Sequence, residues 1–170
     1  YAGYSVHPRV CQLTVRENGQ VTAQASTLGS GGWGQMACVH DNGAFAAAAS
    51  TLGDPAGDEP LMMSSSGVLS VTGSTLLGID GIGQYGLRIN LANVAGLVNG
   101  GNVFSNTTGA LRWISVVGPN QIDTTTTWLG QDASVGLTGG LFFETALVVG
   151  SNSTLTVHGP WLMRGADRWY

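Results

Sequence analysis

The chain contains no lysine, and charged residues occupy only 9% of its 170 positions, against roughly a quarter in an average soluble domain. Its six positive charges are all arginines, they form no cluster, and the net charge is −4. Nucleic-acid binding requires clustered Lys and Arg, so no nucleic-acid partner is expected. A surface with so few charges predicts contact with neighbouring subunits, although a genome that favours Arg over Lys would give the same composition.

Several other signals are missing as well. No run of apolar residues approaches the length of a membrane-spanning helix. The three histidines have no metal-ligand spacing, and no nucleophile elbow occurs. Residues 81–86 match G-x-G-x-x-G, but no acidic residue follows at the distance that a dinucleotide site needs. We therefore expect no enzyme activity, no cofactor and no membrane span.

Cysteine is scarce, with one copy at Cys11 and one at Cys38. Two cysteines in a chain with few charges favour a single disulfide and an oxidising compartment, with buried free thiols as the alternative. Cys38 aligns with Thr14 in the repeat described next, so strict register would place the two thiols on opposite faces. We expect a β-bulge to bring them together, and the bond to contribute about 3 kcal/mol.

An internal repeat is the clearest positive signal. Residues 15–29 recur 24 positions later as residues 39–53, and a fainter third copy covers residues 66–76. Each of the first two copies contains Asn-Gly between alternating apolar and polar residues. Asn-Gly in that setting is a strong signal for a β-hairpin, and the alternation predicts half-buried strands with Val21, Ala23, Phe45 and Ala47 inward.

Two architectures agree with a 24-residue period. The preferred interpretation is an all-β, antiparallel hairpin-repeat sandwich or barrel, jelly-roll-like in character. The alternative is a β-solenoid in which each 24-residue copy forms one coil. Asn-Gly favours the first, and so does the loss of similarity after residue 76. Turns recur about every ten residues to the end, with no linker, so residues 1–170 are expected to form a single all-β domain.

Residues 87–98 are ambiguous, because their apolar positions agree with a strand and with one short helix. Residues 141–149 form an apolar run that Glu144 interrupts, and they predict a buried strand. Asp54, Asp58 and Glu59 lie in a turn-rich loop that could bind an ion but is more typical of a solvated loop. Asn106 and Asn152 begin glycosylation sequons, although triplets of this kind also arise by chance in Ser/Thr-rich chains.

The five tryptophans are the remaining candidates for recognition. Exposed tryptophans stack on sugars and anchor protein interfaces, whereas buried ones fill cores. The C-terminal segment concentrates aromatic and apolar side chains, which predicts an interface with another subunit at five positions: Trp161, Leu162, Met163, Trp169 and Tyr170.

These features favour a non-enzymatic structural subunit of an extracellular or virion assembly. Such a protein would be a capsid decoration or shell protein, or the subunit of a secreted fibre, and would be located outside the cell or on the virion surface. Its expected partners are copies of itself or other shell or fibre subunits. The alternative is a secreted, lectin-like module that binds carbohydrate through exposed tryptophans.

Overall fold

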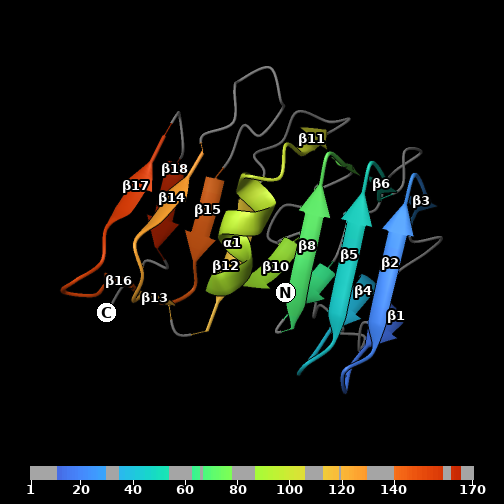
Figure 1. The fold of residues 1–170 in the computed structure, drawn as a ribbon, viewed down its shortest axis with the longest axis horizontal. Coiled ribbons are helices and arrows are strands. Elements are labelled where there is room, and N and C mark those ends of the chain that lie inside the picture. The colour runs from blue at the N-terminus through green and yellow to red at the C-terminus, as the bar shows by residue number, and fades with distance from the viewer. Residues whose placement is uncertain are drawn as a thin grey trace, which may run out of the picture.

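The computed structural model describes residues 11–29, 35–53, 63–65, 67–77, 87–105, 113–118, 120–129, 140–158 and 162–165. Within them the chain winds as a β-solenoid, with each coil adding one element to each of three faces (Figure 1). Every strand pair is parallel in this part of the chain, as in Val21 opposite Phe45, 24 positions later.

The first face is one continuous sheet among the described residues, which we call sheet A. It contains seven strands, in the order β1 (Cys11–Val15), β4 (Gln35–Val39), β7 (Met63–Ser65), β10 (Leu87–Asn90), β12 (Trp113–Val117), β15 (Gly140–Phe143) and β18 (Leu162–Gly165).

The other two faces are interrupted. Sheet B contains β2 (Gln20–Gln24), β5 (Ala44–Ala48) and β8 (Val68–Thr72), and sheet C contains β3 (Thr27–Leu28), β6 (Thr51–Leu52), β9 (Thr75–Leu77) and β11 (Val103–Ser105). After the interruption sheet D pairs β13 (Asn120–Ile122) with β16 (Leu147–Val149), and sheet E pairs β14 (Thr126–Trp128) with β17 (Leu155–Val157).

The all-β prediction is confirmed, and the architecture is the solenoid alternative. The preferred antiparallel hairpin sandwich is wrong, because β1 and β2 belong to different sheets and each pairs in parallel with the next coil. The tight turn itself was predicted correctly. Glu17 and Asn18 have φ values of 55° and 65°, and the Gly19 N–H donates to the Arg16 carbonyl over 2.8 Å. This turn forms a corner of the coil, where a hairpin would have reversed the chain.

Rows of identical or similar side chains, one from each coil, fill the interior. Leu28, Leu52, Leu76 and Phe104 stack in register along sheet C, and the last three are fully buried. On sheet B the inward row contains Phe45, and the predicted inward positions are confirmed: Ala23, Phe45 and Ala47 are buried, and Val21 packs against the core while partly exposed.

A polar ladder runs through the corner between sheets B and C. The Ser26 N–H donates to Ser50 Oγ (3.2 Å), and the Ser50 N–H donates to Ser74 Oγ (3.1 Å). Each hydroxyl also donates to a backbone carbonyl two residues earlier in its own coil. The Ser74 N–H donates to Asn102 Oδ1 (3.0 Å), so an asparagine ends the ladder in the fourth coil. The repeated serines therefore satisfy backbone groups that the corner leaves unpaired.

A helix, α1 (Leu91–Val98), takes the place of a sheet B strand in the fourth coil and lies beside β8 (Figure 1). Asn90 caps its first turn by accepting from the Asn93 N–H. Val94, Leu97 and Val98 are buried at helical spacing. The ambiguous residues 87–98 are thus both a strand, β10, and a short helix.

Three asparagines replace the hydrogen bonds that a strand would have made. Asn93 Oδ1 accepts from the Leu69 N–H (2.9 Å), and Asn93 Nδ2 donates to the Gly67 carbonyl (2.9 Å). Asn102 Nδ2 donates to the Val71 carbonyl (2.7 Å). On the other side of the interruption, Asn99 Nδ2 donates to the Thr127 carbonyl (2.9 Å), and Asn99 Oδ1 accepts from the Leu129 N–H (2.8 Å). Side-chain amides thus act here as substitutes for peptide groups.

Candidate functional site

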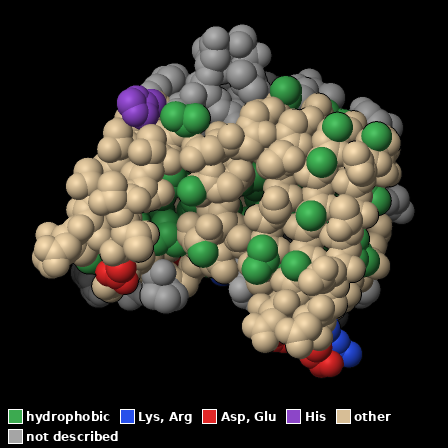
Figure 2. Space-filling model, viewed as in Figure 1, with side chains coloured by type: hydrophobic (Ala, Val, Ile, Leu, Met, Phe, Trp, Pro, Cys, Tyr) green, Lys and Arg blue, Asp and Glu red, His purple; other side chains and the backbone are tan. Residues whose placement is uncertain are grey.

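The outer face of sheet B is a flat surface without charged side chains. The outward positions of its three strands carry only Gln, Thr, Ala, Val and Ser. Figure 2 views the molecule from this side and shows charge only near its margins. The outward residues are Gln20, Thr22, Gln24, Ala44, Ala46, Ala48, Val68, Ser70 and Thr72. Such a face offers hydrogen bonds and methyl groups but no electrostatic selectivity.

The first coil leaves its edge open within the described residues. β1, β2 and β3 are the edge strands of sheets A, B and C. Leu13, Val21 and Leu28, which point into the solenoid, are only partly buried, whereas Phe45 and Leu52 in the next coil are fully buried. The end of the apolar interior is therefore accessible at this coil.

The opposite end shows the same property. β16 and β17 are the edge strands of sheets D and E in the described part of the chain. Val149, which is in register with the buried Ile122 of the preceding coil, is 44% exposed, and Leu147 and Leu155 are partly buried. Residues 141–149 were predicted as one buried strand. That prediction is wrong, because the chain turns a corner at Glu144 and divides the run between sheets A and D.

An ion pair on sheet A connects β10 and β12 with Glu144, the residue that follows β15. Arg88 on β10 donates from Nε and Nη2 to the two carboxylate oxygens of Glu144 (2.9 and 2.7 Å), and Ser115 Oγ on β12 donates to Glu144 Oε1 (2.8 Å). The Arg88 hydrogen bond lowers the pKa of Glu144 despite some desolvation, and Ser115 adds to the effect. The same bond raises the pKa of Arg88. All three polar groups are engaged with one another, and this arrangement indicates a structural role.

Replacing Glu144 with glutamine should cost at most about 1 kcal/mol at neutral pH, because both partners are partly exposed to solvent. The folded-state pKa of Glu144 lies below its ordinary 4.5, so its contribution is complete above that value and is lost as the pH falls through the lowered pKa. Urea unfolding of both proteins should show a gap at pH 7 that closes in acid. Glu17→Gln serves as the control, because the Arg16–Glu17 pair is long (3.9 Å) and exposed. A gap that persists in acid would contradict the linkage.

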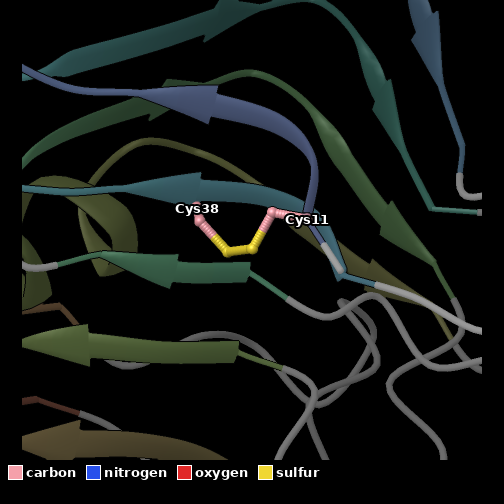
Figure 3. The surroundings of a disulfide bond; sticks show 2 residues. All are labelled: Cys11 and Cys38. Atoms are coloured by element: carbon pink, nitrogen blue, oxygen red, sulfur yellow. A yellow bond between two sulfur atoms is a disulfide. The ribbon is translucent and has the colours of Figure 1, made fainter. Parts of the chain in front are cut away.

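Cys11 and Cys38 form a disulfide pair between neighbouring strands β1 and β4 (Figure 3). Their Cα atoms are 5.8 Å apart, inside the range that disulfides adopt. The predicted β-bulge is not there, because all four register pairs of β1 and β4, including Thr14 with Cys38, keep the same offset. The two cysteines lie on adjacent strands of sheet A, and Cys11 is in register with Gln35, three positions before Cys38, so the pair is diagonal across the two strands. The pair is compatible with an oxidising compartment.

Reducing this disulfide should lower the free energy of unfolding by about 3 kcal/mol, given the 27-residue separation that it closes. Urea titrations with and without a reductant measure the difference, and the Cys11→Ser/Cys38→Ser variant should match the reduced protein. Two free thiols in freshly isolated, unreduced protein, detected by mass spectrometry, would refute the bond.

Most of the other candidate residues lie outside the described residues. These are Trp33, Trp161, Trp169, Tyr170, Asp54, Asp58, Glu59, Asn106 and residues 81–86. Leu162 and Met163 belong to β18, which extends sheet A by pairing with β15. Asn152 is exposed in a turn, as a glycosylation sequon requires.

Trp128 is 2% exposed and stacks on Phe143, with ring centroids 6.3 Å apart. It is therefore a core residue and gives no support to sugar stacking. In the described part of the chain, no group of three or more His, Cys, Asp or Glu residues could hold a metal ion. No helix there has the length and apolar character needed to cross a membrane.

The sequence could have indicated the asparagines of the interruption only indirectly. Asn93, Asn99 and Asn102 lie in and around an apolar helix, where their amides have no other evident use. Comparison with known proteins gives no further guidance, because the chain matches no protein-family model, no curated protein and no solved structure.

Proposed function

We propose that this protein is a non-enzymatic structural subunit of an extracellular or virion assembly, either a capsid decoration or shell protein or the subunit of a secreted fibre. The observation that carries the proposal is the accessible apolar interior at both ends of the described solenoid. Leu13 and Val21 are partly exposed at one end, and Val149 at the other. Solenoids that work as separate monomers normally close their ends with polar capping repeats.

Two further features support the assignment. The outer face of sheet B carries no charged side chain, and a low surface charge promotes association. The disulfide pair stabilises the first two coils, as is usual for proteins that work in an oxidising environment. Both features suit a subunit held among neighbours.

The native mass of material isolated from its source tests the proposal. Electron microscopy and native mass measurement under non-reducing conditions should find the chain in particles or fibres with many subunits. A chain recovered only as a monomer of 17.5 kDa would overturn the assignment. Specific binding of that monomer to a glycan array would favour the carbohydrate-binding alternative.

A further inference from the structure

Within the described residues, the edge of β2 presents a row of backbone groups that pair with no other strand. The Ala44 N–H donates to the Gly19 carbonyl (2.9 Å), and the Ala25 N–H donates to the Ala48 carbonyl (3.1 Å). Alternate residues of a parallel strand bond to the same neighbour. The N–H and C=O groups of Gln20, Thr22 and Gln24 therefore point away from β5, towards the side on which no described strand pairs with β2.

This edge lacks the protection that natural sheet edges usually have. Charged side chains, proline and bulges normally keep edge strands from pairing with other chains. The sequences of β1, β2 and β3 are CQLTV, QVTAQ and TL, which contain neither charge nor proline. The other edge of sheet B, at β8, is covered by Asn93 and Asn102. Within the described residues, one edge of this sheet is thus capped and the other is open.

We propose that a second copy of this chain occupies the open edge, with the two β2 strands pairing antiparallel about a two-fold axis at Thr22. This inference rests on the proposed structural role and names the partner. The axis places Gln20 of each copy opposite Gln24 of the other, so neutral amides meet. A two-fold axis at this position also reverses the chain direction of the whole first coil. Sheet A of one copy therefore meets sheet C of the other, and Leu13 of one copy approaches Leu28 of the other.

The size and shape of the edge also favour a second copy. The first coil spans residues 11–29, close to the roughly 20–30 residues that each partner contributes to a standard interface. Such a two-fold contact is closed and uses the same surface on both subunits. Head-to-tail stacking is less suitable, because β18 extends sheet A beyond the edge strands β16 and β17. The first coil ends at the same level in sheets A, B and C, whereas at the opposite end sheet A extends one strand further than sheets D and E. The first coil of one copy therefore cannot pair with all three edges at the other end of a second copy.

Charge at Thr22 tests the interface directly. Thr22 is exposed, as is Ser70, which lies in the same outward row of sheet B two strands away. Sedimentation of the full chain should show a dimer that Thr22→Lys weakens about tenfold or more, because the two-fold axis brings like charges together. Ser70→Lys adds the same charge away from the edge and should dimerise as the wild type does. Circular dichroism checks that each variant is folded.

A charge-swap experiment identifies the two-fold axis. The Thr22→Lys and Thr22→Glu variants should each dimerise more weakly than the wild type when alone. The two variants should form a mixed dimer when combined. The two-fold pairing is overturned if the mixed dimer does not form. It is also overturned if the wild-type chain forms a filament that Thr22→Lys and Val148→Lys, on edge strands at opposite ends of the described solenoid, dissolve equally. An assembly that Thr22→Lys leaves intact overturns this inference while the structural role stands. A wild-type chain that remains monomeric at every concentration overturns both.

Discussion

Replacing Phe45 with alanine should lower the free energy of unfolding by about 3–5 kcal/mol, the range for a fully buried phenylalanine. Phe45 is 0% exposed, and the rest of β5 consists of alanines. It stacks in register between Val21 and Leu69, so its ring fills the volume that these alanines leave open. Because the neighbouring coils are fixed by their own hydrogen bonds, the cavity cannot collapse easily.

Urea unfolding of the purified variant measures this loss. Val68→Ala is the matched control, because Val68 lies on the adjacent strand but is 59% exposed, and its truncation should change stability by less than about 0.5 kcal/mol. A loss below about 1 kcal/mol for Phe45→Ala, with the control unchanged, would show that the interior of sheet B tolerates the cavity.

The repeat predicted the coil, but the turn suggested the wrong topology. A tight turn with positive φ at Glu17 and Asn18 is compatible both with a hairpin and with a corner between two faces. The difference lies in the strand's partner, which is the following strand in a hairpin and the strand one period later in a solenoid. Ser26, Ser50 and Ser74 distinguish the two, since identical polar residues at a fixed period can hydrogen-bond only when the copies stack in parallel.

The similarity fades after residue 76 although the solenoid continues, because stacking requires only that inward positions stay apolar. Leu87 pairs with Ile114 across a longer coil, and Ile114 with Leu141, without identity at these positions. Coil length also changes freely at the corners, where added residues face solvent. A solenoid thus does not require a fixed period along its whole length.

The candidate surfaces were less predictable than the fold. Apolar residues such as Val149 look like core residues in the sequence, because the pattern of an end coil is the same as that of an internal one. Val149 is 44% exposed because β16 is the edge strand of sheet D in the described part of the chain, whereas its register partner Ile122 in the preceding coil is buried. Trp128 shows the converse, because the sequence left open whether each tryptophan is exposed or buried, and the structure buries this one against Phe143.

The interruption by α1 depends on a small number of amides, and Asn93 bonds to two buried backbone groups, the Leu69 N–H and the Gly67 carbonyl. Replacing Asn93 with leucine should cost about 4 kcal/mol, because the Leu69 N–H and the Gly67 carbonyl would lose these buried hydrogen bonds, each at roughly 1–3 kcal/mol. Leucine favours helix formation more than asparagine does, so any loss of stability reports on the lost bonds to β8.

Ala92→Leu adds the same side chain at the adjacent, exposed position of α1 and should leave stability nearly unchanged. Hydrogen exchange provides the second measurement. The Leu69 amide should lose protection in Asn93→Leu. The Ser50 amide is bonded to Ser74 Oγ in the intact ladder and should keep its relative protection. If Asn93→Leu proves as stable as the wild type, then helix packing alone covers the edge of β8. In that case the asparagine amides are not required for α1 to interrupt the parallel sheet within one chain.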